Sequence, residues 1–322
     1  MALAHTLECP RIGADRELKK ALEAYGKGDL AQEGLRLVGQ QLRAAHWQLQ
    51  KEAGIDLVPV GDFTWHDQVL THSLTFGVIP KRFADTAPGD HGDTQHSQER
   101  TKWFDTHYHY PVPEFTEDQR FKLSWEQLFE EVDEAIALGH KVKPVLIGPL
   151  TYLWLGKAKG DTFDKLDLLD RLLPIYGEIL GRLAGQGVEW VQIDEPILSL
   201  DLPQDWKNAF ERAYHSLQYS PLKKLIATHF GGLGANLGLA VSLPVDGLHL
   251  DLACAPDQLG LVFDRLPIYK VLSLGVVKGR TIWRNDVDNA LALLKEAELR
   301  FGTNLWVANY GSLQDGLRSA AA

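Results

Sequence analysis

Residues 190–196 read Trp-Val-Gln-Ile-Asp-Glu-Pro, a short apolar run that ends in two adjacent acids and a proline. Amphipathic stretches flank this run at 165–186 and 205–217, and their apolar residues recur at three- and four-residue spacing. A short apolar strand between two such helices is the repeating unit of a parallel α/β sheet. The stretch therefore predicts a buried strand whose carboxyl end carries Asp194 and Glu195.

The same unit recurs from one end of the chain to the other. Runs with strand character lie at 6–9, 55–60, 144–147, 190–193, 225–228, 247–252, 271–276 and 305–308. Further helical patterns lie at 30–52, 125–138, 256–266 and 286–301. The turn at 9–13, Cys-Pro-Arg-Ile-Gly, is not the glycine-rich phosphate loop typical of a doubly wound open sheet. Alternating units with these eight strands predict a single-domain (β/α)8 TIM barrel over residues 1–322.

Composition excludes several classes of protein. Lys and Arg number 33 against 43 Asp and Glu, a net charge of −10, and the basic residues are scattered, which argues against a nucleic-acid partner. No apolar run approaches the ~18 residues that cross a bilayer, and residues 1–10 do not resemble a signal peptide. The two cysteines, Cys9 and Cys254, form no Cys-x-x-Cys pair. We therefore expect a cytoplasmic protein without a membrane partner.

Residues 80–119 interrupt the pattern, because they contain several prolines, few periodic apolar positions and four histidines, His91, His96, His107 and His109. A loop of this length in a compact domain is commonly a lid or a binding element. We expect its tip at 85–99 to be mobile and its aromatic part at 101–110 to pack over the barrel mouth. The barrel is thus predicted to carry a lid-like insertion at about 80–119.

Ionisable side chains follow most of the predicted strands, and the chemistry of a TIM barrel lies at these carboxyl ends. They are Glu8 and Cys9, Asp62 and His66, Asp194 and Glu195, His229, and Asp251. Buried carboxylates are costly unless they are paired or bind a cation, so this ring predicts a functional site. Asp194 and Glu195 are its clearest members, because they end a very apolar run.

A divalent metal is one explanation of this ring. Imidazole together with carboxylate or thiolate ligands from separate strand ends is the composition of a catalytic metal site. His229 is the leading candidate ligand. Its possible companions are Asp251, Glu8, Cys9 and His66. We therefore hypothesise a zinc or iron ion at the barrel mouth.

Several of these residues also have a purely structural explanation. Asp62 and Asp251 fit the N-cap position of a helix, and Cys254 fits a small buried hydrophobic position. His107 fits a surface position in an aromatic loop. His249 is expected to lie between the barrel and its helices as a hydrogen-bonded core residue.

A set of motifs resembles the cobalamin-independent methionine synthase family. They are Pro-Arg-Ile-Gly at 10–13, Arg-Glu-Leu-Lys-Lys at 16–20, Ala-Gly-Ile-Asp at 53–56, Val-Gly-Asp-Phe at 60–63, Thr-Lys-Trp-Phe-Asp at 101–105, Gln-Ile-Asp-Glu-Pro at 192–196 and Leu-Pro-Val-Asp-Gly-Leu-His at 243–249. The resemblance spans essentially the whole chain but covers only the amino-terminal one of that family's two barrels. It implies methyl transfer from methyl-tetrahydrofolate polyglutamate to homocysteine, with a zinc ion whose ligands belong to the absent carboxyl-terminal barrel.

The resemblance also implies roles for individual residues. In the family's amino-terminal barrel, the positions that match Arg16, Lys19 and Lys102 hold the anionic folate tail, and cations suit carboxylates in this role. In the carboxyl-terminal barrel, an aspartate in the same Ile-Asp-Glu-Pro motif binds the homocysteine amine. By this resemblance Asp194 is expected to bind a substrate amine.

The departures from the family cluster at the barrel mouth. The family's amino-terminal barrel has tyrosine where this chain has His229, whereas the zinc barrel has a histidine ligand there. Asp251 matches the place of an acid ligand, but the places of the two thiolate ligands are taken by Gly231 and Gly311. Further changes fall at Glu8, Cys9, His66 and His107. A rewritten mouth on an intact scaffold suggests new chemistry.

We therefore hypothesise a stand-alone enzyme that acts on a small amino-acid-like or thiol-bearing substrate, with methyl transfer as the implied reaction class. The expected roles are metal binding by His229, Asp251 and one of Glu8, Cys9 or His66, amine binding by Asp194, proton transfer by Glu195 or His107, and further substrate contacts by Asp62, Arg16, Lys19 and Lys102. The alternative is a non-catalytic half that binds folate polyglutamate and needs a separate zinc-barrel partner protein.

Overall fold

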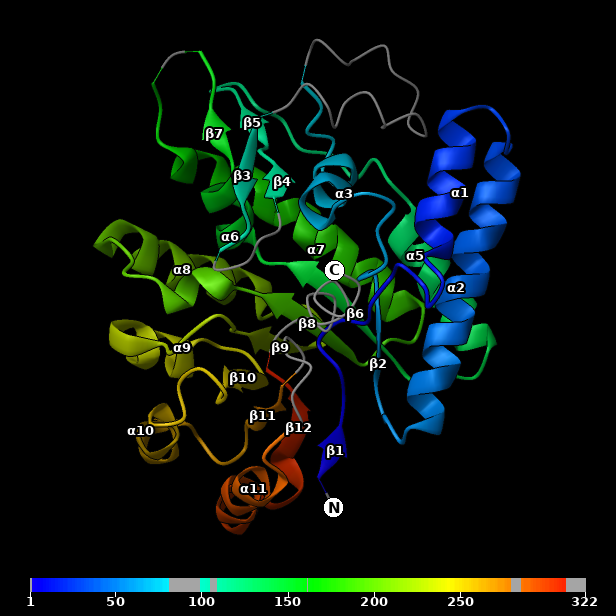
Figure 1. Cartoon of the computed structure of the whole chain (residues 1–322). Helices are drawn as coiled ribbons and strands as arrows, with labels where there is room; N and C mark the ends of the chain where they lie inside the picture. The colour runs from blue at the N-terminus through cyan, green and yellow to red at the C-terminus, as the bar shows by residue number, and fades with distance from the viewer. Residues whose placement is uncertain (1, 81–98, 105–108, 161, 279–284, 311–322) are drawn as a thin grey trace.

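The computed structural model describes residues 2–80, 99–104, 109–160, 162–278 and 285–310. Within these residues an eight-stranded parallel sheet occupies the centre of the molecule (Figure 1). Its strands are β1 (Leu3–Ala4), β2 (Val58–Val60), β6 (Val142–Ile147), β8 (Trp190–Asp194), β9 (Lys223–Ala227), β10 (Gly247–Asp251), β11 (Val271–Val277) and β12 (Leu305–Asn309). A parallel bridge between His5 and Leu57 joins the first strand to the second and closes the sheet. The predicted (β/α)8 TIM barrel is confirmed.

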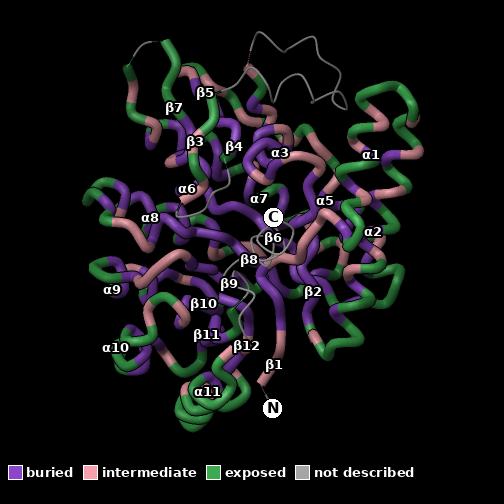
Figure 2. Tube along the Cα trace, viewed as in Figure 1, coloured by how far each residue is buried: buried purple, intermediate pink, exposed green. Residues whose placement is uncertain are grey.

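Helices surround the sheet, with α1 and α2 on one side of the view, α8 to α10 on the other and α11 below (Figure 1). Their bounds are α1 Glu17–Gly26, α2 Gln32–Glu52, α3 Gln68–Thr75, α5 Gln127–Ala137, α6 Pro149–Leu155, α7 Leu169–Gly185, α8 Gln204–Leu217, α9 Leu237–Ser242, α10 Gln258–Arg265 and α11 Val287–Phe301. Buried positions follow the strands and the inner helix faces, while exposed positions follow the outer faces (Figure 2). No helix within the described ranges is both long and apolar enough to cross a bilayer.

Two short strand pairings lie outside the barrel wall within the described residues. β3 (Arg100–Lys102) and β4 (His109–Pro111) form an antiparallel pair, and β5 (Glu114–Phe115) pairs in parallel with β7 (Lys157–Ala158). β3, β4 and β5 belong to the segment predicted as an insertion at about 80–119, whereas β7 follows α6. The predicted mobile tip at 85–99 lies, apart from Glu99, outside the described residues.

The first predicted strand, at 6–9, is wrong, because the first strand occupies Leu3–Ala4. Residues 6–9 contain a bend at Leu7 and do not pair in the sheet, since their backbone groups bind polar side chains from inside the barrel. Lys143 donates to the carbonyl oxygen of Thr6, and the backbone N–H of Leu7 donates to Asn309 Oδ1 at 3.0 Å. The second strand is also shorter than predicted and begins at Val58.

Alternate residues of each strand face the barrel interior, which has an apolar floor beneath a polar layer. The floor is a separate cluster of Leu57, Trp190, Leu225, Val271 and Trp306. Above this floor, the next side chains that point inward are polar. They are His5, Lys143, Gln192, His249 and Ser273. Intervening residues such as Val191 and Leu248 belong instead to the large core between the strands and the helices.

His249 corrects an expectation, because it lies inside the barrel and not between the barrel and its helices. Its Nδ1 lies 2.8 Å from Ser273 Oγ, and the same hydroxyl lies 2.7 Å from His5 Nε2. Burial lowers the pKa of both imidazoles well below the usual range, with the Lys143 charge adding to the effect. Both rings are therefore neutral at pH 7. The strand alternation that puts Leu248 and Leu250 outward requires His249 to point inward.

Candidate active site at the barrel mouth

Three carboxyl groups converge on one buried lysine at the mouth, the rim formed by the carboxyl ends of the strands. Lys143 on β6 is fully buried, and its charge interacts with Asp194, Asp62 and Glu8. Asp194 ends β8, Asp62 follows β2, and Glu8 lies beyond β1. Because parallel strands direct their carboxyl ends to one side, residues far apart in sequence meet here. The structure thus brings together three of the residues predicted from the sequence.

A hydrogen-bonded chain links Lys143 to Asp194 through Gln192. Lys143 Nζ donates to Gln192 Oε1, and Gln192 Nε2 donates to Asp194 Oδ1 at 2.7 Å. Burial raises the pKa of Asp194 well above its usual range, and the nearby Glu8 charge adds to the rise, whereas Gln192 and Lys143 oppose it. Burial also lowers the pKa of Lys143 to about 7. Burial thus disfavours the charged form of both groups.

Asp62 and Cys9 form the second part of the mouth. The backbone N–H of Cys9 donates to Asp62 Oδ2 at 2.7 Å, and burial raises the pKa of Asp62 to about 6. Burial and the Asp62 charge raise the pKa of the Cys9 thiol to about 12. Arg11 faces Glu8 and Asp62 and donates to the carbonyl oxygen of His66 at 2.5 Å. Cys9 is consequently a protonated thiol at neutral pH.

Glu195 points to the opposite side of the β8 strand, into the helical layer. Its carboxylate accepts from the backbone N–H of Leu150 at 3.3 Å, from Thr151 through both its N–H and its hydroxyl, and from Tyr214 at 2.8 Å. The first two partners belong to the first turn of α6, where a carboxylate stabilises the helix. Burial raises the pKa of Glu195 to about 7. The structure does not bring Glu195 to the mouth.

The predicted metal ligands are not assembled by the described residues. His229 follows β9, but Asp251 at the end of β10 accepts from the backbone N–H of Cys254 at 2.8 Å and so stabilises its own turn. His66 lines a hollow of about 540 Å³ between the α1–α2 pair and α3 and α5. Within the described ranges no three His, Cys, Asp or Glu side chains are placed to share an ion.

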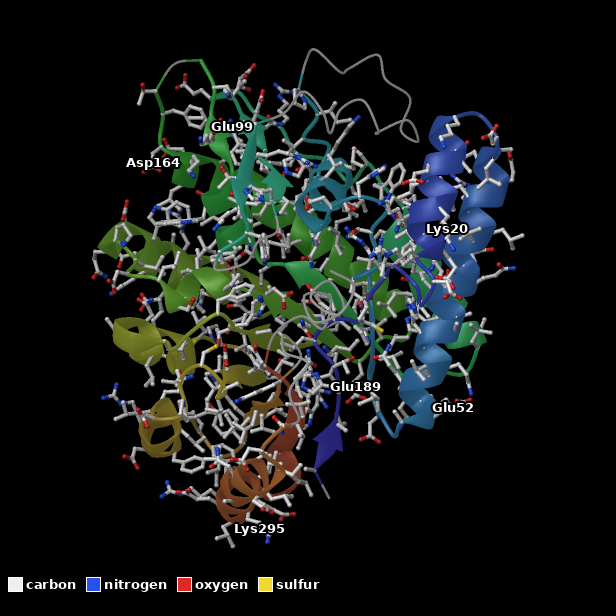
Figure 3. All side chains as sticks on the ribbon, viewed as in Figure 1. Lys20, Glu52, Glu99, Asp164, Glu189 and Lys295 are labelled. Atoms are coloured by element: carbon white, nitrogen blue, oxygen red, sulfur yellow. The ribbon has the colours of Figure 1, made fainter. Side chains whose placement is uncertain are left out.

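The predicted folate-tail cations are exposed and lie on two separate elements. Arg16 immediately precedes α1, Lys19 on α1 pairs with Glu23 at 3.7 Å, and Lys102 ends β3. Figure 3 shows their neighbours Lys20 on α1 and Glu99 before β3 well apart across the molecule. Arg16 and Lys19 therefore lie at the start of one helix, whereas Lys102 belongs to a different element.

The aromatic part of the 80–119 segment reaches the mouth. Phe104, two residues beyond β3, stacks on Phe230 after β9, with ring centroids 5.3 Å apart and 15° between the ring planes. Both residues have left-handed backbone, with φ of 44° and 72°. Such conformations cost about 1–3 kcal/mol in non-glycine residues and concentrate at functional sites. His107, the other predicted proton carrier, lies outside the described residues.

Lys143 and Gln192 are site residues that the inspection of strand ends missed. Both lie inside apolar runs, Val-Lys-Pro-Val-Leu-Ile at 142–147 and Trp-Val-Gln-Ile-Asp at 190–194. The sequence contained a signal for both residues, because a polar residue in a buried strand must face a polar interior or another buried partner. Gln192 also has the same side-chain direction as Asp194 two residues later.

Comparisons with known proteins agree with the barrel. The family model of the cobalamin-independent synthase N-terminal domain matches residues 3–301. A protein described as a vitamin-B12-independent methionine synthase from Listeria monocytogenes is 15% identical with a TM-score of 0.68, covering 97% of this chain and 93% of its own. A B12-independent methionine synthase from Shewanella sp. W3-18-1, solved in complex with selenomethionine, is 18% identical with a TM-score of 0.67, covering 89% and 84%.

A methyltransferase from Methanosarcina mazei has the same architecture, at 13% identity and a TM-score of 0.60, covering 98% of this chain and 90% of that one. At these identities the three structures show the shared fold alone. The family model is more specific, since it spans nearly the entire barrel from β1 to the end of α11. The chain therefore belongs to the family of the amino-terminal domain of cobalamin-independent methionine synthases.

Proposed function

We propose that this barrel binds an amino-acid-like or thiol-bearing substrate of a methyl transfer at its mouth, with Asp194 and Glu8 holding the substrate ammonium. The observation that carries the proposal is the convergence of Glu8, Asp62 and Asp194 on Lys143. The metal-dependent form of the hypothesis has no support in the described donor set, so no catalytic step is assigned to an ion.

The charge balance of the mouth favours a cationic ligand group. Among the described residues, the charges of Lys143 and Arg11 interact with those of four carboxyl groups, namely Glu8, Asp62, Asp194 and Asp67. An entering ammonium compensates part of this excess and takes charge-assisted hydrogen bonds in a desolvated place. An isolated carboxylate or phosphate would instead meet like charges.

The relative from Shewanella supports an amino-acid ligand, because it was solved with selenomethionine bound. Selenomethionine carries an ammonium, a carboxylate and a selenoether in place of the thioether of methionine. The methyltransferase from Methanosarcina mazei supports the reaction class. On this chain both points are proposals that rest on the shared barrel.

Calorimetric titration with L-methionine and L-homocysteine tests the proposal. We expect the wild type to bind one of them and Asp194→Asn to bind it about 10–100-fold more weakly, because a charge-assisted hydrogen bond is worth about 1.5–3 kcal/mol. Asp170→Asn is the control, since Asp170 is an exposed acid on α7 that pairs with Arg212 at 3.7 Å. Equal affinity of Asp194→Asn, or no binding by the wild type, contradicts the proposal.

A second candidate function is favoured by the match to an amino-terminal domain and by the absence of a metal donor set within the described ranges. In it, the chain binds folate polyglutamate and works only with a separate zinc-barrel partner. A folate polyglutamate should then bind the wild type, and the triple change Arg16→Ser, Lys19→Ser and Lys102→Ser should weaken it. Folate binding without amino-acid binding decides for this candidate over the first.

A further inference from the structure

Both the nitrogen and the oxygen of the Gln192 side-chain amide form hydrogen bonds with groups near the mouth. Its amide nitrogen donates to Asp194 Oδ1 at 2.7 Å and to the carbonyl oxygen of Leu7 at 3.3 Å. Its amide oxygen accepts from Lys143 Nζ. One planar group therefore connects a carboxylate at the end of β8 to the backbone beside Glu8.

Lys143 fixes the orientation of the Gln192 amide relative to Asp194. In its charged form Lys143 has donors only, so the amide oxygen turns toward Lys143 and the nitrogen toward Asp194 and Leu7. The reversed amide would place the nitrogen against the ammonium and the oxygen against the carboxylate, which are both repulsive arrangements. Lys143 also donates to the carbonyl oxygen of Thr6 at 3.1 Å, so it fixes the same segment at a second point.

All three side chains are buried, with exposures of 0% for Lys143 and Gln192 and 2% for Asp194. Water cannot replace their hydrogen bonds without entering the barrel, and a buried donor or acceptor without its partner costs about 1–3 kcal/mol. The arrangement is consequently rigid. The floor of Trp190 and its neighbours lies directly beneath it.

We propose that Lys143 and Gln192 are positioning residues that set the spacing between Glu8 and Asp194, and thereby make the mouth selective for a ligand that carries an ammonium. Neither side chain needs to touch the ligand. The selectivity part of this inference rests on the proposed amino-acid substrate, whereas the orientation of Gln192 can be tested without any ligand.

The ligand-free test is hydrogen exchange of the Gln192 side-chain amide, observed by NMR in ¹⁵N-labelled protein and assigned with Gln192→Leu. We expect slow exchange in the wild type and exchange at least about tenfold faster in Lys143→Met, because the amide then loses the contact that fixes its orientation. Lys224→Met is the matched control. Lys224 is another buried lysine, but it donates to Ser220 and Leu222 at the opposite end of the barrel.

The control should leave the exchange of Gln192 unchanged. Rapid exchange in the wild type, or equal exchange in Lys143→Met, overturns the inference. These results do not depend on any ligand, so they are distinct from a failure of the proposed function, which appears as no binding of either amino acid.

The selectivity test compares L-methionine with its deaminated analogue, 4-(methylsulfanyl)butanoate. We expect the wild type to prefer L-methionine and the ratio of the two affinities to fall about tenfold in Lys143→Met. Gln192→Glu is a second variant, because it keeps an oxygen for Lys143 but removes the nitrogen donor, and it should lower the ratio as well. A parallel loss of affinity for both compounds, with the ratio kept, indicates a merely structural role and overturns the inference.

Discussion

Asp194 and Glu195 are adjacent, yet their side chains point to opposite sides of the barrel wall. Asp194 points inward to Gln192 and the acids of the mouth, whereas Glu195 points outward to the start of α6 and to Tyr214. Gly148 makes room for the second carboxylate, because a Cβ there would lie 2.1 Å from Glu195. The Asp-Glu pair thus combines a mouth group with a structural group that fixes the neighbouring helix.

The outward carboxyl group predicts a pH-dependent stability. Burial raises the pKa of Glu195 in the folded protein to about 7, above the ordinary value of 4.5. Its contribution is therefore fully present below pH 4.5 and is lost as the pH rises through 7. Between pH 5 and pH 8 the wild type should lose about 2–3 kcal/mol of unfolding free energy relative to Glu195→Gln.

Urea unfolding at the two pH values measures this difference. Glu178→Gln, which removes an exposed glutamate of α7, is the control for the loss of one charge. If the wild type and Glu195→Gln differ by the same amount at pH 5 and pH 8, the assignment of Glu195 as a buried, shifted group is wrong.

At this scale the sequence predicted which residues lie near the mouth but not where each side chain points. Asp62, Asp194 and Glu8 were found because acids at strand ends gather at one rim. Asp251 also lies there, but its carboxylate binds the backbone of its own turn, a local contact that spacing cannot reveal. The roles expected for His229 and His66 as ligands remain predictions, and no group of three His, Cys, Asp or Glu side chains among the described residues is placed to hold an ion.

Among the elements, the glycines of α7 and α2 show the separate effects of helix propensity and of side-chain packing. It contains Gly177 and Gly181, where a Cβ would meet no atom within 4 Å. In α2, by contrast, a Cβ on Gly39 would lie 2.4 Å from the Trp65 ring. Glycine is thus required by packing in α2, whereas nothing near these two positions of α7 requires it.

Substitution by alanine should have opposite signs in the two helices. Gly181→Ala should stabilise the protein by about 0.5–1 kcal/mol, because alanine loses less backbone entropy in a helix. Gly39→Ala should destabilise it by about 1–3 kcal/mol, because the Trp65 ring must move. Thermal and urea unfolding of the two variants check the prediction, and a loss of stability in both would contradict the space seen around Gly181.

The elements predicted best were strands whose backbone hydrogen bonds go mainly to neighbouring strands. The strands from β8 to β12 lie within about two residues of their predicted positions, since each is a mainly apolar run that pairs with a strand on both sides. Residues 6–9 have the same strand-like composition, but polar side chains of β6, β8 and β12 bind their backbone instead. Local composition could not distinguish these two situations.

At the scale of the whole molecule, the barrel closes between β1 and β2 through few backbone hydrogen bonds. Ala4 O accepts there from the backbone N–H groups of Asp56 and Leu57 at 2.9 and 3.4 Å. β8 and β9, in contrast, are paired along five consecutive residues. The closure of the barrel therefore depends on far fewer hydrogen bonds than the pairing of its central strands.

Hydrogen–deuterium exchange should reveal this difference. We expect peptides that cover 55–60 to exchange at least about tenfold faster than peptides that cover 223–228. Local opening there breaks only the few backbone hydrogen bonds between β1 and β2. Labelling of the intact chain under native conditions, followed by digestion and mass spectrometry of the peptides, measures both regions in one experiment. Equal protection of the two peptides would show that the barrel opens only as a unit.

Residues 6–9 are anchored by side chains and not by a ladder of strand bonds. Anchors of this kind belong to single residues, Asn309 for the N–H of Leu7 and Asp62 for that of Cys9. Point mutations at such positions can reposition Glu8 over evolutionary time while every strand keeps its partners. A family built on this architecture can therefore acquire new ligand preferences through its first ten residues without refolding its scaffold.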